Sequence, residues 1–575
     1  MPRYRLSGLR VPVTRPLDAA LAARILGVEP SVLTACRLVR RSLDARRKPL
    51  LFYEASVEVE TAAPLAPTAL EPPLALEEVP APGDPAPLIP AILAVPAVSA
   101  VPAVPALAAP AGGGRPRVAV VGTGPAGLFA ALALADAGFA PLLLERGDAA
   151  EERYRRVMRF WKGGEFDPES NVQFGEGGAG TFSDGKLTCG KRHAKILVVL
   201  ETLHRFGAPD SVLYDAKPHV GTDRLVVVLR NVRRHLADAG CEIRYRARVV
   251  DVVRRGEGGP LAALVLSTGE EVPVDAAIFA LGHSARDTVA RLVERGVAAS
   301  AKAFAMGVRI EHPQDAVDLI QYGALSGSCG VAPADYKQTH AASNGRGVYT
   351  FCMCPGGEVI ACSSEPGGVV TNGMSRYRRA SGFANSGLVV QTRPEDFAAM
   401  PGPEVLRGQA FQREIERRAF ELGGGTYAAP AIRVTDFLAR GRSPKEPRPL
   451  PKGTYGPAVV PCRLERLYPA PYLEALEEGI LAFDRRMRGF VSDEAVLIAP
   501  ESRTSSPVRL ERNAACESTT LPGLFPAGEG AGFAGGIVSA ALDGLRVARA
   551  VAARLSGEEP SADAEPPSPS AGPEY

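Results

Sequence analysis

The chain is poor in the residues that hold small or metal-dependent proteins together. Its 575 residues include nine cysteines, seven histidines and one tryptophan, with no CxxC pair and no Cys/His spacing of the zinc-binding type. Because the cysteine number is odd and the positions are scattered, we expect neither a disulfide framework nor a structural zinc site. The dispersed histidines predict no other metal site. This cysteine usage fits a cytoplasmic protein.

The sequence also lacks a long apolar run suited to a membrane. The first residues have no apolar core of the signal-peptide type. The longest uncharged run, residues 85–114, is interrupted by several prolines, which a membrane helix does not tolerate. With 66 basic and 64 acidic residues, the formal net charge is only +2. We therefore expect no membrane partner and no partner bound mainly through one large surface of a single charge sign.

Composition and periodicity divide the chain into segments. Residues 1–60 read as strand, helix, helix, strand, and the first fifty contain eleven Arg or Lys against three acidic residues. From residue 115 strands and helices alternate, which predicts an α/β fold with a mostly parallel sheet. The expected division is a small basic α+β domain (1–60), a Pro/Ala-rich linker (61–114), a dinucleotide-binding domain in two parts (115–287 and 501–555), an inserted α+β cap or substrate domain (288–500) and a disordered tail (556–575).

Residues 117–145, RVAVVGTGPAGLFAALALADAGFAPLLLE, have the pattern of a Rossmann-like dinucleotide site. A buried strand leads into Gly122, Gly124 and Gly127, an apolar helix follows, and a second strand ends at Glu145. The three glycines allow a tight turn, a close approach to a pyrophosphate and close helix–strand packing, in that order. A carboxylate at Glu145 would hydrogen-bond a ribose diol and repel a 2′-phosphate, so FAD or NAD is favoured over NADP. The alternative is a glycine-rich turn in an unrelated α/β fold.

Residues 523–547, GLFPAGEGAGFAGGIVSAALDGLRV, favour FAD. A short strand, the pair Gly528-Glu529, a glycine-rich turn and a helix starting near Gly535 follow the pattern of two-dinucleotide-binding flavoproteins. The helix N-terminus then points at the flavin ring, where its dipole stabilises negative charge on the reduced flavin. Glu529 stands where Asp is commoner in such flavoproteins, so the cofactor group that its side chain contacts stays open.

Two further strands complete the expected cofactor site. One, in residues 241–253, places Val249 at the adenine, and the other, in residues 275–284, ends at Gly282. His283 and Ser284 beside it are either polar groups near the site or plain turn residues. The residues expected to contact the cofactor are Gly122, Gly124, Pro125, Ala126, Gly127, Glu145, Arg146, Gly177, Gly178, Thr181, Val249, Gly282, Gly528, Glu529, Gly535, Gly536 and Ile537.

Several long motifs make the chain resemble a bacterial family of largely uncharacterised FAD-dependent, or NAD(FAD)-utilising, dehydrogenases with a glutathione-reductase-like FAD fold. Besides the two glycine motifs, they are NVQFGEGGAGTFSDGKL, FAMGVRIEHPQ, YTFCMCPGGEV, TNGMSRYRRASGFANSG and ESRTSSPVRL. The resemblance implies FAD and an oxidoreductase site, but no substrate. It also implies that the N-terminal unit is native to the family. No second strand-GxGxxG-helix unit follows, so we expect a single nucleotide site beside which NADH, if used, binds transiently.

Lys186 and Arg503 are candidate catalytic residues. Lys186 ends the glycine-rich loop at residues 175–187 and offers a cation to the flavin N1/O2 region or to a substrate carboxylate; the alternative is a surface lysine. Arg503 precedes the last cofactor strand, and its planar fork suits a carboxylate or phosphate. The alternative for Arg503 is a structural ion pair with Glu501 or Glu511. Arg309 and His312, which alternate along the strand in residues 304–314, are further candidates.

Residues 349–362, YTFCMCPGGEVIAC, predict a strand, a Pro-Gly-Gly turn and a returning strand. In a regular strand Cys352 and Cys354 share one face with parallel β-carbons, and their α-carbons lie ~6.6 Å apart at ~3.3 Å rise per residue. A disulfide needs β-carbons within about 4.5 Å, so a direct bond is excluded unless the strand breaks. Both cysteines are catalytic candidates as thiols lining the flavin or substrate pocket. The alternatives are strand cysteines that only pack, or a metal or disulfide site.

The sequence is compatible with three functions. The first is a soluble FAD-dependent oxidoreductase in which a small organic substrate in the cap exchanges a hydride with the flavin. The second is a flavoprotein associated with nucleic acid, of the RNA-modifying type, whose basic N-terminal helix with the sequence RRSLDARRK contacts phosphates. That helix lacks interleaved aromatic residues, which counts against nucleic acid. The third is a non-catalytic FAD-binding protein.

Overall fold

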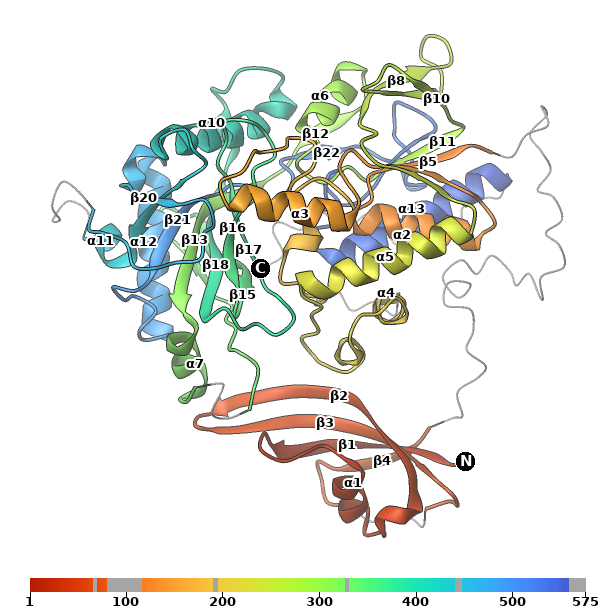
Figure 1. Ribbon diagram of the computed structural model, residues 1–575, viewed down its shortest axis with the longest axis vertical. Helices are drawn as coiled ribbons and strands as arrows, with labels where there is room; N and C mark the ends of the chain where they lie inside the picture. Colours follow the sequence, from red (N-terminus) through yellow and green to blue (C-terminus); the bar gives the residue numbers. More distant parts are fainter. Residues whose placement is uncertain (66–69, 80–115, 190–194, 326–329, 440–446, 558–575) are drawn as a thin grey trace.

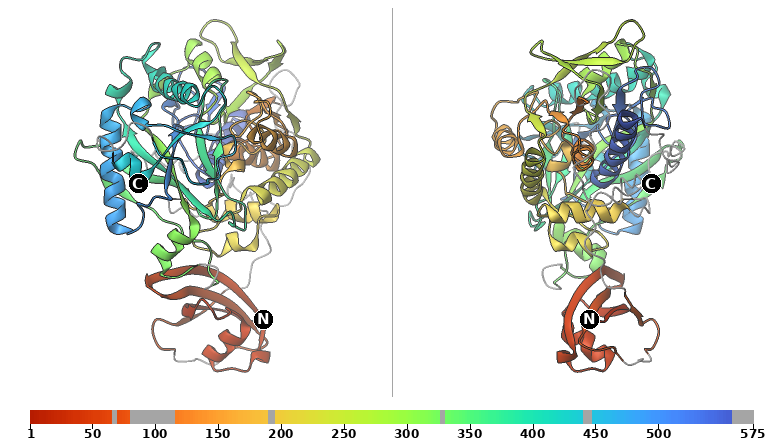
Figure 2. Two further views of the ribbon diagram at one scale, coloured as in Figure 1. Left: turned by 60° about the vertical axis from the view of Figure 1, so that its left-hand side comes forward. Right: turned by 90° about the vertical axis from the view of Figure 1, so that its right-hand side faces the viewer.

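The computed structural model describes residues 1–65, 70–79, 116–189, 195–325, 330–439 and 447–557. The N-terminal unit lies at one end of the molecule, and the two larger parts lie side by side next to it (Figures 1 and 2). Most of the expected linker and the expected tail fall outside the described residues. Within these ranges no helix is both long enough and apolar enough to cross a membrane.

The N-terminal unit is an antiparallel sheet with one short helix. Its strand order is β2-β3-β1-β4, and helix α1 (Ala19–Leu26) packs its apolar face against the sheet. The fourth strand lies in the segment expected to be linker, so the unit extends beyond residue 60. The strands are β1 (Arg3–Pro12), β2 (Leu33–Arg47), β3 (Leu50–Thr61) and β4 (Ala75–Glu78).

The second helix predicted for this unit is wrong, because its residues form strand β2. The sequence there is rich in helix-forming Arg, Leu and Ala, but β2 pairs with β3 along nearly its whole length, and this pairing overrides local propensity. Three of its basic side chains, Arg37, Arg41 and Arg46, form ion pairs with acidic side chains. The basic helix that motivated the nucleic-acid alternative is therefore not formed.

The parallel sheet of the second part confirms the Rossmann-like α/β fold. Its order is β23-β11-β5-β6-β7, with every pair parallel. Helices α2 (Pro125–Asp136), α5 (Thr222–Asp238) and α13 (Ile537–Ser556) lie together below the sheet in Figure 1, and the small antiparallel sheet β8-β9-β10 lies above it. The strands are β5 (Val118–Val121), β6 (Leu142–Leu144), β7 (Glu242–Arg244), β8 (Val249–Arg254), β9 (Leu261–Leu266), β10 (Glu271–Pro273), β11 (Ala276–Phe279) and β23 (Leu524–Pro526).

Helices α2 and α13 pack unusually closely. A β-carbon built on Gly544 of α13 would lie 2.1 Å from the carbonyl oxygen of Ala126 in α2. Any side chain at residue 544 would therefore push the two helices apart. The close contact joins the two glycine motifs, which are far apart in the sequence, into one structural unit.

The third part is built on a mostly antiparallel seven-stranded sheet, in the order β14-β15-β18-β13-β21-β19-β20. The chain enters and leaves it through a paired neck, β12 (Ala299–Ala301) with β22 (Val508–Leu510). Helices α10 (Arg407–Leu422) and α12 (Ala470–Arg486) pack on the sheet. Its strands are β13 (Phe304–Pro313), β14 (Thr339–Ala341), β15 (Gly347–Cys354), β18 (Phe383–Thr392), β19 (Ala429–Arg433), β20 (Val459–Pro461) and β21 (Val496–Glu501).

The hairpin predicted around Pro355-Gly356-Gly357 is wrong. Strand β15 pairs with β14 and β18, whereas β16 (Glu358–Ala361) pairs with β17 (Thr371–Met374). The two strands do not pair with each other because another segment packs against the turn between them. A β-carbon on Gly356 would lie 1.7 Å from the carbonyl oxygen of Arg379. The Gly357 N–H is also taken by the carbonyl of Phe383. The turn therefore carries the chain from one sheet to another.

A buried carboxylate joins the second and third parts. Glu416 of α10 accepts two hydrogen bonds of 2.8 Å from Arg286, the first residue of α6 (Arg286–Glu294), and two of 2.9 and 3.0 Å from Arg503. Glu416 and Arg286 are each only 1% exposed. Although burial alone would raise it, the two guanidinium groups hold the pKa of Glu416 well below its usual range.

We expect the substitution Glu416→Gln to lower the free energy of unfolding by about 3 to 5 kcal/mol, because it removes the fully buried carboxylate that two buried guanidinium groups share and leaves only the partly exposed Glu365 near them. Because the pKa of Glu416 is lowered in the folded protein, the difference from wild type should be fully present above the usual glutamate pKa of 4.5 and shrink as the pH falls below it. Denaturant unfolding at several pH values measures both effects.

The control is Glu414→Gln on the same helix, whose ion pairs with Arg417 and Arg418 lie at the surface. We expect a much smaller loss for this variant. Equal losses for the two variants at neutral pH would contradict a special role for the buried carboxylate.

Candidate functional site

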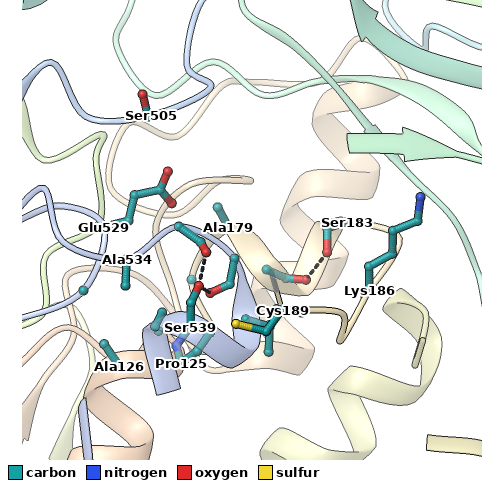
Figure 3. A pocket seen from close by; sticks show the side chains of 18 of the residues that line it. Pro125, Ala126, Ala179, Ser183, Lys186, Cys189, Ser505, Glu529, Ala534 and Ser539 are labelled. Carbon is teal, nitrogen blue, oxygen red and sulfur yellow. Dashed lines mark hydrogen bonds between the residues drawn. The ribbon is translucent and has the colours of Figure 1, made fainter. Parts of the chain in front are cut away.

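A cavity of about 2040 Å³ lies where the three parts of the molecule meet. It is lined by both glycine motifs, by residues 349–353 of β15, and by Arg41 and Lys48 of the N-terminal unit. Sites for one small molecule usually measure about 300 to 1,000 Å³. This cavity therefore has room for a dinucleotide and a second molecule. Figure 3 shows Glu529 and Ala534 on one side of it and Lys186 on another.

The glycines of the first motif differ in what the fold requires of them. A β-carbon on Gly122 would lie 2.4 Å from the carbonyl oxygen of Ala280, and one on Gly127 would lie 1.9 Å from that of Gly122. Gly124 has φ −71° and its built β-carbon meets nothing closer than 3.8 Å. Protein packing thus does not require glycine at residue 124, whereas a ligand pyrophosphate at the N-terminus of α2 does. The cradle fits a dinucleotide.

Most residues expected at the cofactor lie on the cavity wall, but three do not. Gly127 packs helix against strand, as expected. Gly177 and Thr181, also expected to contact the cofactor, lie behind the wall, and the Thr181 hydroxyl donates to the carbonyl of Glu176. Those on the wall are Gly122, Gly124, Pro125, Ala126, Glu145, Arg146, Gly178, Val249, Gly282, Gly528, Glu529, Gly535, Gly536 and Ile537.

Arg153 shapes the glycine-rich loop and was missed by the sequence analysis. It is fully buried in α3 (Ala150–Trp161), and burial lowers its pKa to about 10. An arginine in an amphipathic helix gives no sequence signal that it points inward. Its guanidinium donates to four loop carbonyls, those of Asn171 at 2.8 Å, Val172 at 2.7 Å, Gly175 at 3.2 Å and Glu176 at 2.7 Å.

Glu145 lines the cavity at the end of β6. One carboxylate oxygen accepts from the N–H and hydroxyl of Thr123, at 2.9 and 2.7 Å, and the other accepts from the N–H groups of Gly147 and Gly175, both at 2.9 Å. Glu145 therefore ties together the loops that surround the cofactor cradle. Since four donors already occupy the carboxylate, a ribose hydroxyl would have to share or replace one of them.

The second motif presents a helix N-terminus and a carboxyl group to the cavity. Helix α13 begins after Gly536, which has φ +85° and supplies no capping side chain, so the first N–H groups of the helix stay available to a ligand. Glu529 lies close by, and its burial raises its pKa to about 7 although Lys302 acts in the opposite direction. Lys302, also on the cavity wall, was not anticipated because it lies in a short loop without a motif.

Arg503 lies on the cavity wall, but its fork already holds a carboxylate. The structural ion pair considered as its alternative is formed, with Glu416 instead of Glu501 or Glu511. Arg503 also donates to the Ser284 hydroxyl at 2.9 Å, which lies 3.0 Å from Nδ1 of His283. Burial, then the nearby guanidinium groups of Arg503 and Arg286, lower the pKa of His283 to about 3. His283 therefore presents a neutral imidazole to the cavity.

Lys186 is not an isolated surface lysine. Its ammonium group donates to the carbonyl oxygen of Met353, reaching from the glycine-rich loop to β15. Cys352 lines the cavity beside this contact, and Cys354 is fully buried behind it. The structure thus brings three predicted catalytic residues, Lys186, Cys352 and Cys354, to one end of the cavity.

The two further candidates in β13 have different surroundings. Arg309 is 0% exposed and donates to the carbonyl of Cys352 at 2.5 Å and to Glu501 at 3.0 Å. His312 is buried elsewhere and bonds the carbonyl of Phe490 at 2.8 Å. In the part of the chain that the structure describes, no three His, Cys, Asp or Glu side chains gather in a way that could hold a metal ion.

Known proteins resemble this chain in sequence and in fold. Residues 303–504 match the family described as FAD-dependent protein, C-terminal domain-like. A protein of Clostridium beijerinckii, described as uncharacterized, is 46% identical over 433 residues, which cover 75% of this chain and 80% of its own length.

Two solved structures show lower similarity. CtdE in complex with FAD is 11% identical, with a TM-score of 0.30, over 77% of this chain and 85% of its own. A flavoprotein/dehydrogenase of Cytophaga hutchinsonii is 13% identical, with a TM-score of 0.33, over 77% and 80%. The sequence matches and the cradle geometry lead to one conclusion: the chain belongs to this family of FAD-dependent proteins, and FAD is its cofactor.

Proposed function

We propose that the protein is an oxidoreductase that exchanges a hydride between FAD and a small organic substrate admitted beside the third part of the molecule. The observation that carries this proposal is the shared cavity: residues of both glycine motifs and of β15 line the same space. A protein that only stored FAD would need no room for a second molecule beside the cofactor. The extra volume is the feature that favours catalysis over non-catalytic binding.

The chain's residues have defined tasks in this proposal. When bound, FAD supplies the hydride acceptor or donor. The N-terminus of α2 would hold the pyrophosphate, and that of α13 would stabilise negative charge on the flavin ring. The neutral imidazole of His283 faces the cavity as a hydrogen-bonding group at neutral pH. Residues 349–353 of β15 form part of the wall around this space.

We further propose NADH as a transient reductant. In the described part of the chain only the parallel sheet around β5 carries a strand-GxGxxG-helix unit, and that unit would hold FAD. NADH would therefore enter the cavity, deliver its hydride and leave before the organic substrate binds. The supporting observation is again the size of the cavity.

Gly124→Ala tests the cofactor site. We expect the variant to fold normally, because its β-carbon meets only ordinary contacts, and to bind FAD about tenfold more weakly or worse, a loss of about 1.4 kcal/mol, because the methyl group displaces the pyrophosphate. Titration of the apoprotein with FAD, followed by flavin fluorescence, measures the affinity. The control is Gly368→Ala, whose β-carbon also has room and which lies outside the cavity lining. Equal FAD affinity in both variants would contradict the placement of the pyrophosphate.

Anaerobic addition of NADH tests the reductant. We expect the absorbance of the bound oxidised flavin to disappear in a two-electron step, because the cavity admits a second molecule beside the cofactor. Stopped-flow absorbance measures the rate, with NADPH as the matched comparison. If neither nucleotide bleaches the flavin, the hydride comes from the organic substrate, and a small-molecule screen with the same readout identifies the donor. Flavin that neither NADH nor any screened donor reduces would overturn the proposed function.

A further inference from the structure

We propose that Cys352 and Cys354 form a redox-active dithiol, with Cys352 as the thiol that attacks a disulfide substrate and Cys354 as the thiol that resolves the mixed disulfide. This inference deepens the proposed function and rests on it, because FAD in the same cavity is the electron partner of the dithiol. The substrate class it names is a low-molecular-weight disulfide.

The first observation is that strand β15 breaks where the two cysteines lie. Cys352 has φ +44°, a left-handed conformation that side chains other than glycine rarely adopt, and the register with β18 shifts between Phe351 and Cys354. In a regular strand the parallel β-carbons would forbid a bond between residues two apart. The break takes the pair out of that regular geometry. Backbone strain and β-bulges of this kind are found preferentially at functional sites.

The second observation is the arrangement of the two sulfur atoms. Cys352 lies on the cavity wall, whereas Cys354 is 0% exposed and lies behind it. The Cys354 thiol donates a hydrogen bond of 3.3 Å to the carbonyl oxygen of Cys352. Of the two, Cys352 is the thiol that a substrate in the cavity can meet, and Cys354 is its buried neighbour. This asymmetry is what an attacking thiol and a resolving thiol require.

The third observation is the positive charge around the pair. Arg309 donates to the carbonyl of Cys352 at 2.5 Å and approaches Sγ of Cys354 at 3.5 Å, while Glu501 holds Arg309 from the other side. The neighbouring Cys354 thiol lowers the pKa of Cys352 and outweighs burial; the charges of Arg309 and Lys186 lower it further, and Asp184 acts in the opposite direction. The thiolate is the nucleophilic form of cysteine. Cys352 is therefore activated without a histidine base.

Gly373 provides the space for this arrangement. A β-carbon at residue 373 would lie 2.3 Å from Nη2 of Arg309 and 2.2 Å from the side-chain oxygen of Asn385, which accepts a 2.9 Å bond from Arg309. A side chain here would displace the guanidinium from the dithiol. The glycine of β17 thus fixes the position of Arg309 and, through it, the charge near Cys352.

The chemical step balances with a disulfide RSSR as the oxidant. The Cys352 thiolate attacks one sulfur, forms an S–S bond to it and releases RS⁻. Cys354 then attacks the Cys352 sulfur, the Cys352–Cys354 bond forms, the second RS⁻ leaves, and the proton of Cys354 together with one from water gives two RSH. The dithiol loses two electrons and the substrate gains them. When bound, FAD in its anionic reduced form would, with one proton from water, supply the two electrons and two protons that restore the Cys352 and Cys354 thiols.

The test uses the FAD-loaded protein and oxidised glutathione as the probe. The protein is incubated at graded ratios of reduced to oxidised glutathione, and its free thiols are then alkylated. After digestion, mass spectrometry measures the masses of the cysteine-containing peptides. We expect the peptide carrying Cys352 and Cys354 to lose two hydrogens, while Cys362, eight residues further on, keeps its thiol because burial raises its pKa. Cys354→Ser should instead trap glutathione on Cys352, and Cys352→Ser should leave Cys354 unmodified. Thiols that persist at 352 and 354 at every ratio would overturn the dithiol.

Lys186→Met is the positioning variant. We expect the pH midpoint for alkylation of Cys352 to move upward, because a positive charge that favours the thiolate is removed, whereas a purely structural role of Lys186 would leave the midpoint unchanged. Lys195→Met, which removes another lysine from the cavity wall, is the matched control and should not move the midpoint. An unchanged midpoint in Lys186→Met counts against the electrostatic activation of Cys352.

Flavin absorbance separates this inference from the proposed function. If Cys352→Ser binds FAD that NADH or another donor bleaches, but the wild-type protein never forms the disulfide, the dithiol fails and the oxidoreductase stands. If the disulfide forms with glutathione but no donor reduces the flavin, the oxidoreductase fails and the inference, which rests on it, falls too. Oxidised glutathione should reoxidise the reduced flavin in the wild-type protein but not in either cysteine variant. That result supports both the oxidoreductase function and the dithiol.

Discussion

The charge balance at Glu416 determines how the two halves of the site face each other. A carboxylate and two guanidinium groups leave water when α6, α10 and the segment after β21 come together, and the cost of desolvation is offset only when all three are in place. Docking of the third part on the parallel sheet is therefore specific in position. That docking sets β15 opposite the glycine motifs and makes one cavity from surfaces that belong to different sheets.

The dinucleotide cradle is the part of the site that the sequence predicted well, because close backbone packing around this turn requires its glycines. Gly122 and Gly127 have no room for a β-carbon, and such positions recur at fixed spacing in any protein with this turn. Lys186 was also found, since a cation in a glycine-rich loop stands out. Its actual partner, a carbonyl of β15, was not predictable, because the two segments meet only through the docking of separate domains.

The errors share one physical origin, which is the dominance of distant contacts over local preference. Residues 33–47 favour a helix locally but extend along β3. The turn at residues 355–357 looks like a hairpin, yet a segment more than twenty residues away fills the space where the returning strand would lie. Thr181 sits in the expected loop but turns toward a loop carbonyl. Likewise, nothing in the sequence marks the left-handed conformation of Cys352, so the sequence left the role of the cysteines open.

The close packing of α13 on α2 has a consequence for biosynthesis. During translation the first glycine motif leaves the ribosome long before α13 and β23, so the nascent chain holds only half of a cofactor cradle while the intervening domains are made. Tight FAD binding must wait until the last helix reaches α2. Cofactor capture therefore marks chains whose synthesis has passed α13, and a chain cut short before residue 537 leaves the apolar surface of α2 open to proteases and chaperones.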